Sequence, residues 1–211
     1  SGNTMVSFET NSIYTSSAGS NAPSGLVRLS KKNIDFDAGT LDIYMTNIPG
    51  CGYCTDDNYN TKERCLDLGC DAGASCTPEW IVDEKMTEGE CEALGILDNH
   101  GSYTGEDIGV WFDGNIGGFQ FYLKGIEITG LSGGTAEQYL DFVSYNAGSG
   151  KILGTSFSGS LIPAGEDILL TTVTFTLLPD YTENGICFGE DDPDVDCVPD
   201  CINPVFSDPD A

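Results

Sequence analysis

The chain has 211 residues and is strongly acidic, with 34 Asp and Glu against 8 Lys and Arg and a formal net charge of −26. A surface this negative repels nucleic acid and anionic membranes, and it is tolerated best where salt screens the charge. We therefore expect no nucleic-acid partner, and we favour a salt-rich extracellular medium, although acidity also serves solubility in general. No segment approaches the roughly 20 apolar residues of a membrane-spanning helix, so we expect no membrane span.

Nine cysteines also favour an extracellular, secreted protein, because disulfides persist in oxidising compartments. The chain begins at Ser1 without a basic and then apolar leader, so we expect a removed signal peptide or a fragment. Since the count is odd, one thiol is expected to be unpaired or intermolecular. The predicted disulfide cysteines are Cys51, Cys54, Cys65, Cys70, Cys76, Cys91, Cys187, Cys197 and Cys201.

Residues 1–24 are rich in Ser, Thr, Asn and Gly and predict an extended N-terminal arm. Such an arm packs either on its own domain or on a neighbouring subunit, and the sequence leaves both open. A short β-type patch within it is our candidate assembly strand, formed by Thr4, Met5, Val6, Ser7, Phe8 and Glu9.

Residues 25–31 and 39–46 alternate as strands do, with Leu41, Ile43 and Met45 on one face of the second. The turn signal between them, at Asp37 and the residues up to Gly39, predicts that the two strands pair. After these two segments the strand-like alternation is absent for more than fifty residues.

Residues 51–105 hold six of the cysteines and predict a disulfide-rich insertion of loops and short helices that closes on itself. An internal repeat lies inside it, TKERCLDLG at residues 61–69 and TEGECEALG at residues 87–95. Each copy has Thr at a helix N-cap position and Gly at a C-cap position, and Thr87 with Glu90 fits a capping box. Each copy therefore predicts a helix of one or two turns.

Residues 107–112 return to strand character and lead into alternating segments. Phe119, Phe121 and Leu123 share one face of the first segment, and Trp111 with Phe119 are expected to fill the core. In the last segment the residues expected on one face are Leu169, Thr171, Val173, Phe175 and Leu177. Gly-rich turns at residues 132–134, 147–150 and 162–165 separate the segments.

We therefore predict an all-β fold, an antiparallel jelly-roll-like β-sandwich formed by residues 25–50 and 106–211. Residues 185–188 and 202–206 are expected to be short strands that flank an Asp- and Pro-rich loop. Function is then to be sought on the rims and insertions of the sandwich.

The segments GGFQFYLKG, KILGTSFSG and LIPAGEDILLTTVTFT, with the closing ICFGE, resemble cohesin-type and related carbohydrate-binding-module sandwiches of extracellular proteins. The resemblance covers about residues 41–47 and 107–188, and it implies a nine-stranded jelly roll that serves as a binding or structural module. Two departures stand out: residues 124–130 replace the family's Tyr-Asp-Pro turn, and the cysteine-rich insertion has no counterpart. The resemblance therefore carries over the sandwich and not a dockerin-binding surface.

No catalytic set is recognisable. His100, the only histidine, lies in a Gly-rich loop without a nucleophile elbow, and a lone loop histidine is usually solvated. Glycoside hydrolysis needs two carboxylates close together, and with 34 acidic residues such a pair is expected in any case. Its presence would therefore not indicate a hydrolase. Cys51 and Cys54 have the spacing of a zinc or redox site, but a second matching pair is missing, so disulfides are favoured. We expect no enzyme.

A structural Ca²⁺ ion is a candidate cofactor, because hard cations bind several oxygens from a tight loop. A solvated acidic turn explains the same residues, and the pairs Asp35 with Asp37 and Asp113 with Asn115 are weaker candidates. The main candidate ligands are Asp191, Asp192, Asp194 and Asp196.

A glycan is a candidate partner, because exposed aromatic side chains form carbohydrate platforms. Packing within the insertion explains the same side chains equally well. The candidate contacts are Tyr53, Tyr59, Trp80 and Tyr103.

We expect an extracellular structural subunit that assembles into a filament or surface layer, in which the N-terminal patch adds a strand to a neighbouring copy. The alternative is a cohesin-like or carbohydrate-binding adhesion module of a larger secreted protein. The disulfide connectivity, the ligand and the source stay open.

Overall fold

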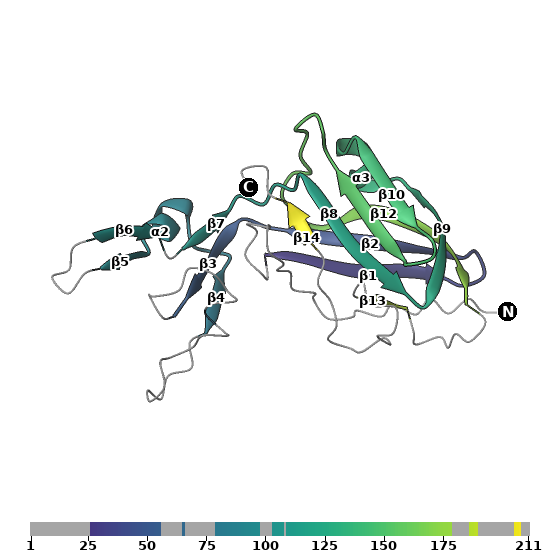
Figure 1. The fold of residues 1–211 in the computed structure, drawn as a ribbon, viewed down its shortest axis with the longest axis horizontal. Helices are drawn as coiled ribbons and strands as arrows, with labels where there is room; N and C mark the ends of the chain where they lie inside the picture. The colour runs from purple at the N-terminus through teal and green to yellow at the C-terminus, as the bar shows by residue number, and fades with distance from the viewer. Residues whose placement is uncertain are drawn as a thin grey trace.

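The structure is a computed structural model. It describes residues 26–55, 65, 79–97, 103–107, 109–178, 186–189 and 205–207. These residues form two stacked antiparallel sheets, with a small lobe that extends from one end of the stack (Figure 1). The predicted all-β antiparallel fold is confirmed, while the jelly-roll description stays a prediction.

The first sheet has four strands in the order β1-β2-β12-β9. The hairpin of β1 (Val27–Asp35) and β2 (Thr40–Asn47) forms as predicted. Its turn is stabilised by the Asp35 carboxylate, which accepts hydrogen bonds from the amides of Asp37 and Ala38 at 3.0 and 2.9 Å. β2 then pairs with β12 (Gly165–Leu177), which pairs with β9 (Ile126–Ser132).

The second sheet has the order β10-β11-β8-β13, with β14 on the same strand β8. Its strands are β8 (Gly118–Lys124), β10 (Phe142–Asn146), β11 (Lys151–Thr155), β13 (Cys187–Gly189) and β14 (Val205–Ser207). The last two lie where the sequence predicted short strands, and they pair with different ends of β8.

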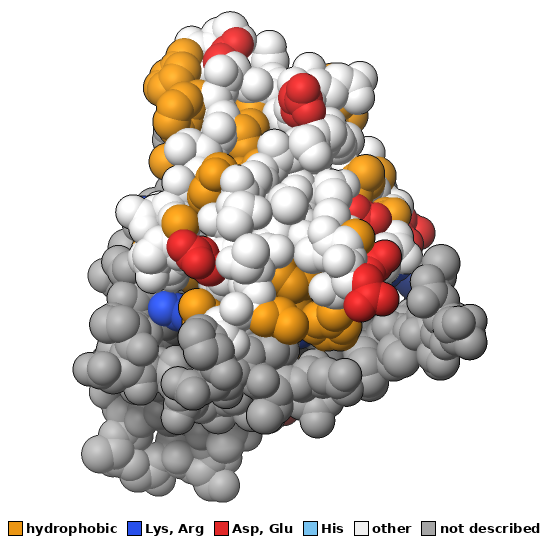
Figure 2. All heavy atoms as spheres, turned by 90° about the vertical axis from the view of Figure 1, so that its right-hand side faces the viewer, with side chains coloured by type: hydrophobic (Ala, Val, Ile, Leu, Met, Phe, Trp, Pro, Cys, Tyr) orange, Lys and Arg blue, Asp and Glu red, His pale blue; other side chains and the backbone are white. Residues whose placement is uncertain are grey.

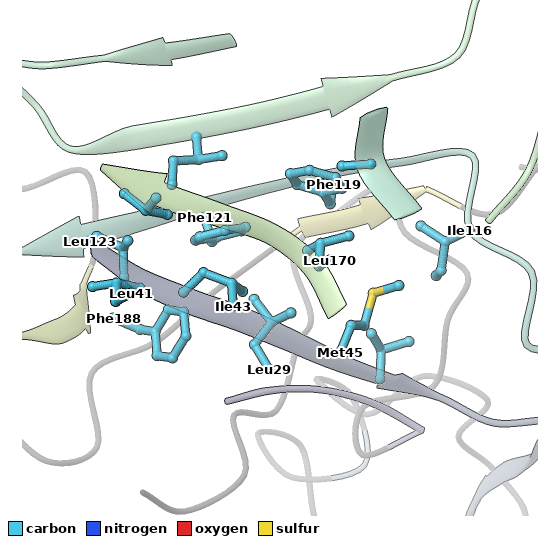
Figure 3. Close-up of a cluster of buried hydrophobic side chains, with 14 of the residues drawn as sticks. Leu29, Leu41, Ile43, Met45, Ile116, Phe119, Phe121, Leu123, Leu170 and Phe188 are labelled. Carbon is cyan, nitrogen blue, oxygen red and sulfur yellow. The ribbon is translucent and has the colours of Figure 1, made fainter. Parts of the chain in front are cut away.

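The hydrophobic core lies between the two sheets (Figure 3). Leu41, Ile43 and Met45 of β2 face Phe119 and Phe121 of the other sheet, and all five are 2 % exposed or less. The predicted inward faces of β2 and β8 are therefore confirmed.

The alternation predicted for the last long strand is only partly right. Thr171, Val173 and Phe175 are buried, but Leu169 is only half-buried and Leu170 enters the core in its place. The register with β2 shifts between Leu169 and Thr171, and a β-bulge of this kind turns the side chains that precede it to the other face. Leu177, at the end of the strand, is 46 % exposed.

A short helix replaces one predicted turn. α3 (Gly134–Tyr139) follows β9 directly, where the Gly pair at residues 133–134 indicated a turn alone. Both glycines have positive φ, and a side chain on Gly134 would lie 2.3 Å from the carbonyl oxygen of Leu170. The helix carries the chain from the first sheet to the second, where β10 begins.

The lobe is built on a three-stranded sheet of β3 (Gly50–Cys54), β4 (Trp80–Asp83) and β7 (Val110–Phe112). A two-stranded ribbon, β5 (Gly95–Leu97) and β6 (Tyr103–Asp107), and the helix α2 (Glu88–Glu92) complete the described part. The segment at residues 110–112, which the sequence assigned to the sandwich, thus belongs to the sheet of the lobe. Phe112 enters the buried cluster of the sandwich, whereas Trp111, which was predicted to do so, stays half-buried.

The predicted helix at residues 87–95 forms with its capping box. The Thr87 hydroxyl accepts the Glu90 amide, and the Glu90 carboxylate accepts the Thr87 amide at 2.9 Å. Its C-cap is Ala93 and not Gly95, which already belongs to β5. The other repeat copy lies outside the described residues except for Cys65, whose backbone is helical.

Candidate interaction surfaces

The cysteines of the lobe that the structure describes are crosslinked in disulfides. Cys51 is bonded to Cys91 and Cys54 to Cys65, so the two cysteines of the CxxC spacing pair with different partners. Cys187 is disulfide-bonded as well. The remaining predicted cysteines, which lie outside the described residues, are Cys70, Cys76, Cys197 and Cys201.

The calcium candidates that the structure describes are turn residues. The Asp113 carboxylate accepts the Asn115 amide at 2.7 Å, much as Asp35 accepts the amides of its own turn. In the part of the chain that the structure describes, no three Asp, Glu, His or Cys residues are grouped so that they could hold a metal ion. The main candidates, Asp191, Asp192, Asp194 and Asp196, lie outside it, as does His100.

The structure places two of the four predicted glycan contacts, Tyr53 and Trp80, in the sheet of the lobe. Trp80 lies opposite Cys54 in the lobe sheet, and Tyr53 is the neighbour of Cys54 in β3. Since successive residues of a strand point to opposite faces, Tyr53 and Trp80 lie on opposite faces of the sheet, and each is half-buried. Tyr103 is described by its backbone alone, in β6, and Tyr59 lies outside the described residues.

One candidate surface is the outer edge of β1. This nine-residue strand pairs with β2 and with no other described strand. Next to the Val27–Asn47 pair, the Ile48 amide donates to the Leu26 carbonyl at 3.1 Å. In an antiparallel ladder hydrogen-bonded and non-hydrogen-bonded pairs alternate, so Val27 and Asn47 form a non-hydrogen-bonded pair. Every second amide of β1 therefore points away from β2. The outward amides in the regular part of the strand are those of Val27, Leu29 and Lys31.

Basic residues are concentrated on the same strand. β1 carries Arg28, Lys31 and Lys32, three of the eight basic residues in the chain. Arg28 forms an ion pair with Glu84 of the lobe at 2.7 Å, and Lys32 forms one with Asp167 of β12. Among the strands that the structure describes, β1 is therefore the most basic, in a protein whose net charge is −26.

Lys31 differs from its two basic neighbours because its side chain points into the sandwich. It is 8 % exposed, its ammonium donates to the carbonyl of Ile186, and it lies 6.0 Å from the centroid of the Phe188 ring. Burial lowers the pKa of the Lys31 amine below its ordinary value of 10.5. This side chain ties the edge of the first sheet to the second sheet just before β13.

The second candidate surface is a pair of exposed rings, Phe142 and Phe157. Phe142 begins β10 and is 42 % exposed, and Phe157 lies in the loop after β11 and is 79 % exposed. Their ring centroids are 6.3 Å apart. No periodic pattern in the sequence predicts this pair, because the rings come from a strand end and a serine-rich loop that only the fold brings together.

Asp141 holds the loop that presents Phe157. Its carboxylate accepts hydrogen bonds from the amides of Phe157 and Ser158, both at 2.8 Å, and from the hydroxyls of Ser156 and Ser158 at 3.2 and 2.7 Å. The Ser158 hydroxyl and then the other donors lower the pKa of Asp141 below its ordinary value of 3.8. The backbone on both sides of the Phe157 ring is therefore anchored although the ring is exposed.

The exposed rings lie in a stretch without acidic residues. Of the 211 residues 34 are acidic, yet residues 142–165 contain no Asp or Glu and one basic residue, Lys151. This acid-free stretch comprises β10, β11 and the loop that carries Phe157. Figure 2, which views the molecule from the right-hand side of Figure 1, shows a described surface that is largely uncharged, with hydrophobic groups between separate acidic side chains.

Comparisons with protein-family models, curated proteins and solved structures find no match to this chain. Within the described residues no helix is both long and apolar enough to span a bilayer.

Proposed function

We propose that the protein is an extracellular structural subunit that assembles head to tail, with β1 of one copy accepting an extended strand from the next. The observation that supports this most directly is the long edge of β1, which offers a row of outward amides. An edge of this kind, which pairs with no other described strand, is a template for an added strand. The disulfides are compatible with an oxidising extracellular location.

The charge of β1 restricts the choice of donor. Arg28 and Lys32, although each has an acidic partner within the chain, disfavour the pairing of β1 with β1 of a second copy, because their like charges would meet along the shared edge. An acidic chain approaches the same edge favourably. The contact is therefore heterologous, and a heterologous contact that does not close propagates into a fibre.

The proposed donor is the segment 4–9, which lies outside the described residues. Residues 10–25 separate it from Leu26, at the start of the sandwich. An extended chain spans at most about 3.3 Å per residue, so this connection reaches about 50 Å, while β1 is about 30 Å long. The connection is thus long enough to bring the segment to the β1 edge of an adjacent copy.

Two variants of Lys31 test the acceptor edge. Lys31→Met removes the ammonium and keeps the outward amide, whereas Lys31→Pro removes both and leaves the hydrogen bonds to β2 in place. We expect filaments from the Met variant and none from the Pro variant, by electron microscopy of samples whose folding is verified by circular dichroism. Equal assembly of the two variants would show that β1 is not the acceptor.

Deletion of residues 1–15 tests the donor in the same assay. We expect the shortened chain to keep the thermal midpoint of its sandwich and to lose assembly. Polymerisation of the shortened chain would assign the donor role to another segment.

The second candidate function is a monomeric cohesin-like or carbohydrate-binding adhesion module. The exposed rings of Phe142 and Phe157 favour it, because sugar rings stack on aromatic side chains. A glycan array separates the two functions: the module binds a glycan saturably as a compact particle, and the structural subunit does not.

A further inference from the structure

We propose that residues 190–204, named here the acidic excursion, keep the edge of the second sheet from accepting a strand, so that each copy accepts one at β1 alone. This selection of the edge rests on the strand exchange proposed above and names the edge that takes no part in it. Without such a device the sandwich would present two acceptor edges on one side, and the assembly would branch.

β13 and β14 are the two halves of one interrupted edge strand. Gly189 of β13 lies opposite Tyr122 of β8, and Val205 of β14 lies opposite Gln120. β11 pairs with the same two residues of β8, so both halves lie on the side of β8 that faces away from β11. A single residue would be enough to join them into a continuous strand. The chain instead joins them with the fifteen residues of the acidic excursion.

The interrupted edge is a neighbour of β1. Among the described strands β1 pairs only with β2, and β13 and β14 pair only with β8. The Lys31 ammonium of β1 donates to the carbonyl of Ile186, one residue before β13, and Figure 1 shows β13 beside β1. A strand that approaches the sandwich from this side therefore meets both edges.

Charge favours β1 over the interrupted edge. Arg28 and Lys32 are basic residues of β1, whereas the acidic excursion holds six acidic residues and no basic one. An approaching copy has a net charge of −26, so it is attracted to the first edge and repelled from the second. The six acidic residues are Glu190, Asp191, Asp192, Asp194, Asp196 and Asp200.

The course of the backbone acts in the same direction. An added strand needs a continuous row of outward amides, and every second residue of a strand supplies one. Each half of the interrupted strand has three residues and therefore offers at most two such amides. Pro204, which directly precedes β14, has no amide proton to donate. Interruptions, like charges and prolines are the means by which natural sheets protect their edges from strand addition.

Excision of the acidic excursion tests the proposal. A single threonine replaces it in the Lys31→Pro chain, which is not expected to assemble, and the variant also carries Cys187→Ser because Cys197 and Cys201 are lost with the excursion. We expect this chain to regain assembly through its second edge, by sedimentation and electron microscopy. The same excision in the chain that keeps Lys31 should give branched filaments. A chelator is present throughout, so that no Ca²⁺ ion neutralises the carboxylates.

Two controls keep the result specific. The Lys31→Pro chain that retains the excursion and carries serine at Cys187, Cys197 and Cys201 should stay monomeric, because its second edge is still interrupted. A second variant of the Lys31→Pro chain keeps the length and the cysteines of the excursion and replaces Asp191, Asp192, Asp194 and Asp196 by Asn. It should assemble at a concentration at least about tenfold lower than a control with the same net charge. That control replaces four exposed carboxylates elsewhere by Gln, at Glu79, Glu88, Glu92 and Glu166.

The outcomes separate this proposal from strand exchange at β1. If the excised chain, verified as folded by circular dichroism, and the Asn variant both stay monomeric, the second edge is no acceptor and the proposal fails. Equal assembly of the Asn variant and the Gln control would also overturn it, since net charge alone would then limit assembly. If the excised chain does not fold, the Asn variant decides.

Failure of strand exchange has a different signature. Assembly of the Lys31→Pro chain with its excursion intact would count against β1 as the acceptor. The acidic excursion would then still be supported if excision increased assembly further, and refuted if it did not. Assembly of the excised chain alone, with none from the unaltered protein, would support the role of the excursion and refute the proposed function.

Discussion

The sandwich and the lobe are parts of one chain, and they are stabilised in different ways. The sandwich buries more than twenty hydrophobic side chains between its sheets, among them Phe121, which stacks on Phe119 and meets Phe188 edge-on. In the described part of the lobe the disulfide-bonded Cys51, Cys65 and Cys91 are 0 % exposed, whereas Phe112 of its sheet packs into the core of the sandwich. The backbone at Gly109 passes so close that a Cβ there would lie 2.9 Å from the sulfur of Cys91. Burial thus stabilises the first part, and crosslinks stabilise the second.

The largest effect is expected from a cavity in the sandwich. Phe121→Ala removes a ring that is 1 % exposed, and the free energy of unfolding should fall by about 3–5 kcal/mol. The measurement is urea unfolding followed by circular dichroism. The control is Phe157→Ala, at a ring that is 79 % exposed, which should change the same quantity by less than about 0.5 kcal/mol. Equal losses in both variants would show that the two-sheet core does not carry the stability of the sandwich.

A smaller and local effect is expected from the lobe. Replacement of Cys51 and Cys91 by Ser opens a crosslink between residues 40 positions apart, which should cost the lobe about 3 kcal/mol through the entropy of the open chain. Hydrogen exchange, read per strand, is the measurement. Protection should fall in β3, β4 and β7 and persist in β2 and β12. An equal fall in all five strands would mean that lobe and sandwich unfold as one unit.

The fold was predictable where one local pattern decides it. Alternation alone placed Phe119, Phe121 and Leu123 in the core, and Thr87 with Glu90 located a helix start. The prediction failed where contacts between distant segments decide. The bulge in β12 arises from its register with β2. The alternation in the sequence runs through Leu169 without a break and therefore does not reveal it. In the same way Phe112, and not Trp111, enters the core because its strand joins the sheet of the lobe.

The candidate surfaces were harder to predict than the fold. Phe142 and Phe157 are 15 positions apart, and neither the strand pattern nor the turn signals distinguish them from core residues. The acid-free stretch, in contrast, is visible in the sequence once the charge of the whole chain is compared with that of residues 142–165. The tyrosines of the lobe predict glycan contacts there, but the strand alternation places Tyr53 and Trp80 on opposite faces of its sheet.

The smallest effect is expected where the two sheets meet at the edge of β1. Burial lowers the pKa of Lys31 in the folded protein, so the charged amine disfavours folding at every pH below that lowered value. As the pH rises from the folded pKa toward the ordinary value of 10.5, the unfolded chain binds the additional proton, and the disadvantage disappears. Lys31→Met removes this pH dependence, so the stability of the unaltered protein relative to the Met variant should rise as the pH increases from the folded pKa toward 10.5. Urea unfolding of both chains across this alkaline range is the measurement. A difference independent of pH would show that Lys31 acts through its packing and its hydrogen bond to Ile186, and not through its charge.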